Sequence, residues 1–193
     1  MLNAIKMKKI QGSLAILLIV LLLGACKGDP QERLLGKIED HQDELNSVMD
    51  EHADNDQLAR ETAALFEQYI TEYPGDTSRV PEFYYEATRL YTLGGDYDKA
   101  IPLADTFRVK YPDHPLAPII LHLKGYLIYE TGMHDLEKAR DTYLTFIETY
   151  PEHPLVQDVL FSLEHLGQTN EELMEEIKRK NRSHGDQDST SND

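Results

Sequence analysis

Histidine is the residue type that could most readily provide chemistry in this chain, which holds eight histidines among 193 residues. A zinc enzyme would show two histidines one turn apart on a helix with a glutamate beside them, as in His-Glu-x-x-His, and that motif does not occur. His114 and His153 lie 39 residues apart in two matching segments. We therefore interpret them as turn or capping residues, and we expect no metal-binding residues.

Other catalytic signatures are also missing from the sequence. It contains no Gly-x-Ser-x-Gly, no phosphate-binding loop and no dinucleotide fingerprint. Gly94 and Gly95 have the type expected of a turn between helices, and the acidic residues Asp40, Asp43 and Glu44 fit a solvated helix face. We expect no catalytic residues, no cofactor and no enzymatic activity.

The only cysteine, Cys26, follows a segment with the features of a secretory signal. Lys6, Lys8 and Lys9 precede an apolar run over residues 14–23, and no acidic residue occurs before position 29. An apolar run of about ten residues suits a signal peptide and is too short to cross a bilayer, which needs about 20. We predict a signal peptide over residues 1–25.

The end of this signal, Leu23-Gly24-Ala25-Cys26, resembles the lipobox of bacterial lipoproteins. The resemblance implies cleavage before Cys26, attachment of a diacylglyceryl group to its sulfur and acylation, for example with palmitate, of its freed amine. Lys27 stands where an aspartate would imply retention at the inner membrane, so the resemblance implies the outer membrane, on its periplasmic or cell-surface face. The alternative is an ordinary secretory signal with an unrelated cysteine. On the first interpretation, residues 26–33 are a lipidated tether.

Composition limits the classes of partner. The chain has 35 acidic and 19 basic residues, a formal net charge of −16, which argues against binding nucleic acid because phosphate contacts depend on lysine and arginine. A single cysteine excludes an intramolecular disulfide framework. Apolar residues make up 40% of the chain, enough for a core, whereas residues 182–193 are polar and predicted to be disordered.

A repeat of 38 to 39 residues organises the rest of the chain. Tyr-Pro pairs end matching segments at positions 73–74, 111–112 and 150–151. Apolar residues recur before each pair at helical spacing, and proline stops a helix. A second apolar helical pattern lies between successive Tyr-Pro pairs. The sequence predicts an all-α helical domain over residues 34–181 arranged as a solenoid.

The middle unit resembles a tetratricopeptide repeat. Its tyrosines, Gly-Asp-Tyr turn, small residue and closing proline match the motif at Tyr84, Tyr91, residues 95–97, Ala100 and Pro112. The next unit keeps Ala139 and Pro151 with about two residues inserted, and the first has Thr62 at the small position. The resemblance implies a solenoid of about four antiparallel helix pairs.

The length of the repeat is similar to that of an envelope subgroup of tetratricopeptide proteins. This subgroup includes the outer-membrane lipoprotein of the barrel-assembly machinery and the periplasmic Tol–Pal coordinator, both interaction scaffolds. By repeat phase, the resemblance places a partner-binding groove at Tyr85, Arg89, His122, Tyr126, Tyr129, Phe161 and His165. The alternative is that Tyr126 and Phe161 pack in the core between neighbouring helix pairs.

These observations favour an outer-membrane-anchored lipoprotein scaffold. It would bind an envelope protein or peptide through the helical groove and contact the membrane through the lipid on Cys26. The alternative function is a surface-exposed lipoprotein that captures an extracellular peptide or glycan for a transporter.

Overall fold

The computed structural model describes residues 28–49, 55–169, 171–175 and 178–179 of the chain. This part of the protein is all-helical and contains no strand. The signal peptide and Cys26 lie outside the described residues, as does the predicted disordered tail. The helices are α2 (Pro30–Met49), α3 (Asp56–Glu72), α4 (Val80–Leu93), α5 (Tyr97–Lys110), α6 (Leu116–Leu123), η1 (Lys124–Gly132), α7 (Leu136–Thr149) and α8 (Val156–Glu164).

The chain divides into two compact units, residues 1–53 and 54–193. In the first unit, α2 begins at Pro30, four residues before the predicted start of the helical domain. Asp29 accepts a hydrogen bond from the amide of Gln31 at 3.1 Å, and proline suits the first helical position because it lacks an amide hydrogen. The last residues of the predicted tether are therefore the first turn of a helix.

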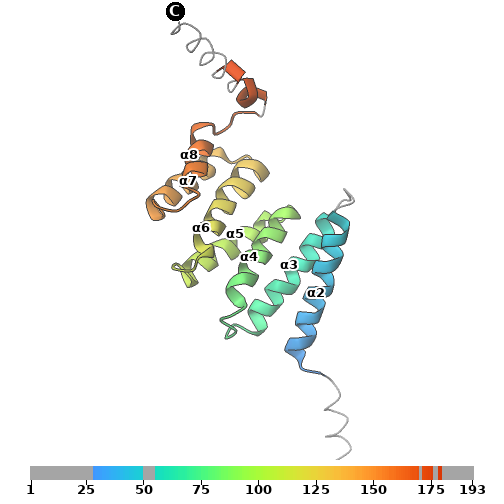
Figure 1. The fold of residues 1–193 in the computed structure, drawn as a ribbon. Helices are drawn as coiled ribbons and strands as arrows, with labels where there is room; N and C mark the ends of the chain where they lie inside the picture. The colour runs from blue at the N-terminus through green and yellow to red at the C-terminus, as the bar shows by residue number, and fades with distance from the viewer. Residues whose placement is uncertain (1–27, 50–54, 170, 176–177, 180–193) are drawn as a thin grey trace, which may run out of the picture. The chain divides into compact units, whose positions relative to one another are not determined.

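The second unit consists of helices that follow one another as packed neighbours (Figure 1). α3 packs on α4, α4 on α5, η1 on α7, and α7 on α8. Each Tyr-Pro pair ends a helix in the same backbone conformation: Tyr73, Tyr111 and Tyr150 have φ of −127°, −132° and −128° and ψ of 52°, 54° and 55°. The predicted helix ends are confirmed, and the sequence repeat corresponds to a repeated turn geometry.

The core repeats with the turns. The small-residue positions Thr62, Ala100 and Ala139 are fully buried. The buried hydroxyl of Thr62 donates to the carbonyl of Leu58 at 2.7 Å, so a threonine can replace alanine here without leaving a polar atom unpaired. Four residues before each closing tyrosine, an aromatic ring is also fully buried, at Tyr69, Phe107 and Phe146.

The predicted turn histidines have equivalent contacts. The Nδ1 atom of His114 accepts from the amide of Leu116 at 3.2 Å, and that of His153 accepts from Leu155 at the same distance. Each imidazole also meets the buried phenylalanine of its own repeat edge-on, with ring centroids 5.7 and 5.8 Å apart. Both histidines therefore lie in turns, which was one of the two roles predicted for them, whereas the N-cap residues of α6 and α8 are Pro115 and Leu155.

The third repeat departs from the others within its first helix. After α6 the chain continues as the π-helix η1, in which the amide of Met133 donates to the carbonyl of Ile128, five residues earlier, at 2.8 Å. A π-turn holds more residues than the 3.6 of an α-turn, so η1 accommodates the inserted residues without breaking the helix. The following helix then starts normally, with Asp135 accepting from the amide of Lys138 at 3.1 Å.

Candidate functional site: an aromatic hollow beside α8

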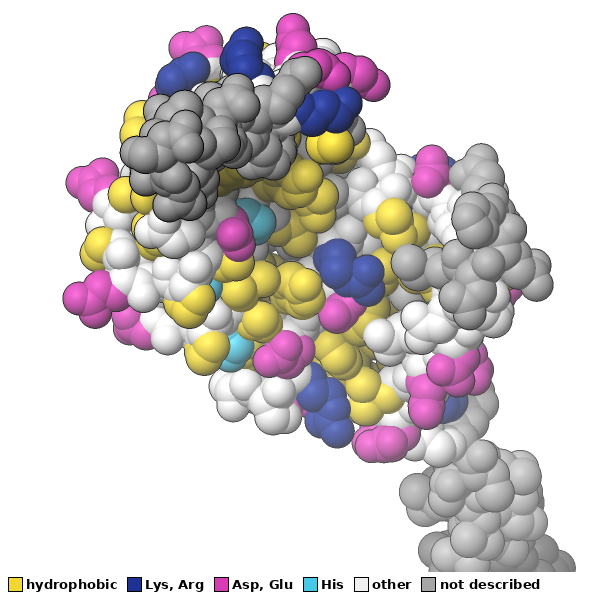
Figure 2. Space-filling model, turned by 45° about the horizontal axis from the view of Figure 1, so that its top comes forward, with side chains coloured by type: hydrophobic (Ala, Val, Ile, Leu, Met, Phe, Trp, Pro, Cys, Tyr) yellow, Lys and Arg dark blue, Asp and Glu magenta, His cyan; other side chains and the backbone are white. Residues whose placement is uncertain are grey.

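A half-open hollow of about 290 Å³ lies in the second unit, beside the last described long helix. Its walls come from the end of α6, from η1, from α8 and from the segment after α8, and its lining residues are His122, Tyr126, Glu130, Asp158, Phe161, Ser162, His165, Gln168 and Leu173. Figure 2 shows hydrophobic side chains gathered across one face of the molecule with histidine side chains beside them. We call this site the aromatic hollow.

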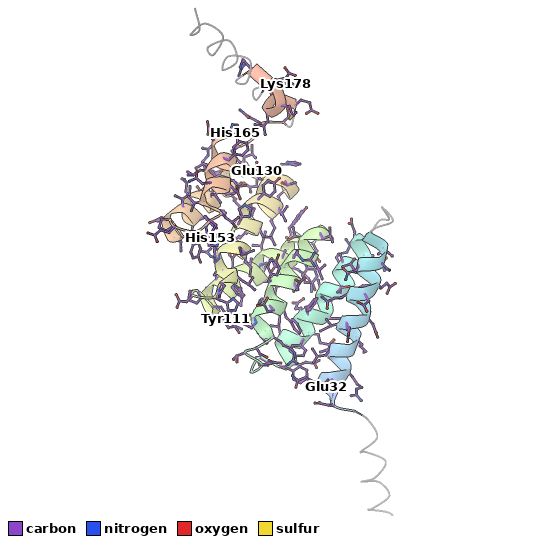
Figure 3. The ribbon with its side chains drawn as sticks, viewed as in Figure 1. Glu32, Tyr111, Glu130, His153, His165 and Lys178 are labelled. Carbon is purple, nitrogen blue, oxygen red and sulfur yellow. The ribbon has the colours of Figure 1, made fainter. Side chains whose placement is uncertain are left out.

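Helical spacing explains how these side chains converge. His122, Tyr126 and Glu130 follow one another at four-residue intervals. Asp158 and Phe161 of α8 lie three residues apart, and His165, the C-cap of that helix, follows four residues later. Residues at these intervals share a helix face. In Figure 3, Glu130 and His165 lie near each other, whereas His153 lies at the opposite end of α8. The hollow therefore opens between two helix faces.

The aromatic rings of the hollow lie in two pairs, one stacked and one tilted. His122 stacks on Tyr126 with ring centroids 6.0 Å apart, and Phe161 lies against His165 at 4.2 Å. Tyr126 and Phe161 are 43% and 48% exposed, although a core role would bury both. The Nδ1 atom of His165 lies 2.8 Å from the carbonyl oxygen of Phe161, which fixes the imidazole one turn along the helix.

The polar residues of the hollow include two carboxyl groups and two imidazoles. The buried hydroxyl of Tyr143 donates to Glu130 Oε2, and burial together with this hydrogen bond raises the pKa of the tyrosine. Burial lowers the pKa of His122, helped by His153 and opposed by the carboxylate of Asp158. The lowered pKa favours the uncharged form of the His122 imidazole, and the carboxyl groups that line the hollow are those of Glu130 and Asp158.

Of the seven predicted groove residues, the structure brings four together in the hollow: His122, Tyr126, Phe161 and His165. Tyr85 and Arg89 are half-buried on α4 outside it, and the guanidinium of Arg89 pairs with Glu86 at 2.7 Å.

Tyr129 was predicted to line the groove, but its side chain is buried, with only 7% of the residue exposed. The ammonium groups of Lys124 and Lys138 lie 5.5 and 5.6 Å from its ring centroid. It belongs to η1, whose wide turns change the direction of each side chain relative to an α-helix. The repeat phase of an ordinary α-helix therefore placed Tyr129 on the wrong face.

The sequence prediction missed the acidic residues of the site. Glu130 lies four residues after Tyr126, and Asp158 lies three residues before Phe161. Extending the two predicted helix faces by one turn in each direction would have found both.

Within the described ranges, no group of three or more histidine, cysteine, aspartate or glutamate side chains could hold a metal ion. A second hollow, of about 400 Å³, lies between the two repeated turns and includes His114 and His153, whose Nδ1 atoms are already hydrogen-bonded to backbone amides. None of the described helices is both long and apolar enough to cross a bilayer.

No protein-family model matches this sequence, and no curated protein matches it. The function must therefore be argued from the aromatic hollow and the repeated turns.

Proposed function

We propose that this protein is a lipid-anchored scaffold of tetratricopeptide type that binds an envelope protein or peptide through the aromatic hollow. The observation that carries the proposal is the exposure of Tyr126 and Phe161 within one concave site. Aromatic side chains are enriched among the residues that dominate protein–protein binding, and they contribute most where they line a pocket.

The repeated turns support the tetratricopeptide assignment. The Tyr-Pro helix ends, the buried small positions and the equivalent histidine turns recur in phase with the 38- to 39-residue repeat. A chain that stacks such units in about four helix pairs presents rigid helix faces to a partner, and nothing in this interpretation requires catalysis.

The membrane anchor is the second part of the proposal. Cys26 would carry the lipid, and acyl chains on both its sulfur and its amine would hold the protein stably at the outer membrane. Anchoring raises the local concentration of any partner that shares the same surface. The anchor and the hollow would then act together, one fixing the position and the other selecting the partner.

Position-specific crosslinking in cells tests the hollow. A photoreactive phenylalanine analogue is placed at position 126 or 161, and for comparison at Val109 or Leu144, which are 82% and 49% exposed and lie outside the hollow. We expect one partner to be crosslinked from the first two positions and not from the second two. Equal crosslinking from all four positions would contradict the proposal.

Membrane fractionation of the same cells tests whether Cys26 anchors the protein. The Cys26→Ser variant should leave the membrane fraction while the domain stays folded, and a variant that remains membrane-bound would contradict lipidation. If the crosslinked partner is a subunit of an envelope assembly, the scaffold function is supported. If it is a nutrient transporter, the capture function takes its place.

A further inference from the structure

We propose that the aromatic hollow recognises a positively charged side chain, an arginine or lysine on an exposed segment of the partner protein. This side chain would lie against Tyr126 and Phe161, with its charged group directed to Glu130 and Asp158. The inference rests on the proposed function and specifies the chemistry of the partner.

The acidic side chains of the hollow have no lysine or arginine partner in the described part of the chain. Of the described residues, no lysine or arginine lines the hollow. Neither Glu130 nor Asp158 takes part in an ion pair of the described structure. Two carboxylates at a site that no described lysine or arginine neutralises favour a cationic ligand. Burial lowers the pKa of His122, which disfavours a competing positive charge on its imidazole.

Other tyrosine rings of this protein are in contact with lysine side chains. Lysine ammonium groups lie over the rings of Tyr84, Tyr91 and Tyr129, at 5.2 to 5.6 Å from the ring centroids. These distances are typical of cation–π contacts. In the described part of the chain no lysine or arginine lies over Tyr126 or Phe161, so a cation from outside can approach each ring on the side that its histidine neighbour does not cover.

The size of the hollow also limits its ligand. Pockets for whole small molecules hold about 300 to 1,000 Å³, so a half-open hollow of about 290 Å³ suits one or two side chains. Arginine combines a flat cationic group with an apolar stem, which suits stacking on aromatic rings with carboxylates at hydrogen-bonding distance. The net charge of −16 also attracts basic segments at long range.

The test uses the full-length protein in dodecyl maltoside, an uncharged detergent. The probe is the peptide acetyl-Gly-Arg-Leu-Arg-Gly-amide, and its matched control carries citrulline, which is nearly isosteric with arginine but neutral, at both arginine positions. Binding is followed by saturation-transfer difference NMR. We expect the citrulline peptide to bind at least about tenfold more weakly, and the arginine peptide to weaken as salt is added. Equal binding of the two peptides would overturn the inference.

Matched variants locate the binding. Asp158→Asn should weaken arginine binding by about three- to tenfold. Glu164→Gln is the control, because it removes the same charge from the same helix outside the hollow and should change binding less than twofold. Equal losses in the two variants would mean that general surface charge, rather than the hollow, attracts the peptide.

Two further outcomes remain informative. Residues 178–182 of this chain include Lys178, Arg179, Lys180 and Arg182. If the peptide binds only after residues 176–193 are deleted, the occupant of the hollow is the chain's own basic tail and the inference about a partner is wrong. If the peptide shows no charge preference while crosslinking from positions 126 and 161 persists, the proposed function stands and only the cationic recognition fails.

Discussion

His134 and Gly95 occupy the same position in two successive turns. Each directly precedes the aspartate that begins the next helix, Asp135 or Asp96, and each has a positive φ, 53° for the histidine and 72° for the glycine. Glycine adopts this left-handed conformation without steric cost, whereas a residue with a Cβ atom is strained there. The third repeat therefore uses a strained residue where the second uses an unstrained one.

We predict that His134→Gly stabilises the protein by about 1 kcal/mol, because the exposed histidine loses little packing and the strain is relieved. Gly95→Ala should destabilise it by about 1 to 2 kcal/mol for the opposite reason. Urea unfolding followed by circular dichroism measures both changes. Destabilisation by His134→Gly would show that the side chain contributes more than its backbone conformation costs.

A second prediction concerns Gly125, where the helix η1 approaches α7. A Cβ atom at this position would lie 2.8 Å from Cε1 of Tyr143. Gly125→Ala should therefore destabilise the fold by about 1 to 3 kcal/mol, although alanine is the better helix former. Gly36→Ala is the control, because its Cβ would meet no atom within 4 Å, and it should stabilise α2 by up to about 1 kcal/mol. Two changes of the same sign would contradict the predicted close approach.

A third prediction concerns the buried hydroxyl of Tyr91. It donates to Glu67 Oε2 at 2.7 Å, and Lys99 Nζ donates to the same oxygen at 3.0 Å. Burial, together with the bond to Glu67, raises the pKa of Tyr91 to about 12, so the phenol stays protonated and remains a donor. Tyr91→Phe should lower the free energy of unfolding by about 1 kcal/mol. Lys99→Met should lower it by only about 0.5 kcal/mol or less, because the lysine belongs to an exposed ion pair. Chemical unfolding of both variants checks the order, and the reverse order would assign the stabilisation to the ion pair.

A fourth prediction concerns acid stability and the turn after α3. Asp76 accepts hydrogen bonds from Ser78 at 2.7 Å, from Tyr69 at 2.5 Å and from Arg79 at 2.9 Å, and these contacts hold its pKa well below the ordinary value of 3.8. The folded state therefore binds this proton less tightly than the unfolded state. Its stabilising effect is complete above pH 3.8 and is lost as the pH falls toward the lower folded-state pKa.

Asp76→Asn should consequently be less stable than the wild type at neutral pH and lose less stability on acidification. Asp113→Asn is the control, because Asp113 is exposed in a turn and its carboxylate accepts no hydrogen bond in the described structure. Urea midpoints at about pH 6 and about pH 2.5 supply the comparison. If the urea midpoints of the wild type and Asp76→Asn fall by the same amount on acidification, protonation of Asp76 does not contribute to acid sensitivity.

Local signals predicted the helical character and the repeated turns. Proline after tyrosine ended α3, α5 and α7 where expected, and the small residue that the motif match identified in the middle repeat, Ala100, is fully buried. These features depend on a few neighbouring residues, so they can be found in a single sequence. The start of α2 was missed although its signal was equally local, with Asp29 at the cap and Pro30 at the first helical position.

The candidate site was predictable only in part. The apolar pattern between the second and third Tyr-Pro pairs predicted a helix there. It could not distinguish the α-helical part, α6, from the π-helical part, η1, because both carry an apolar face. η1 packs on α7, and a tertiary contact of this kind cannot be read from the period of apolar residues. Tyr126 lines the hollow and is exposed, whereas Tyr129, three residues later, is buried.

The π-helix η1 also has a consequence for chain length. Because its turns are wide, η1 contains more residues than an α-helix of the same axial length would contain. Deleting one residue between Lys124 and Gly132 would allow the segment to rewind as an α-helix, while α6 and α7 at its two ends keep their own partners. In most helices such a deletion would rotate every later side chain away from the core. Here the number of residues can change in the wall of the aromatic hollow while the rest of the stack keeps its register.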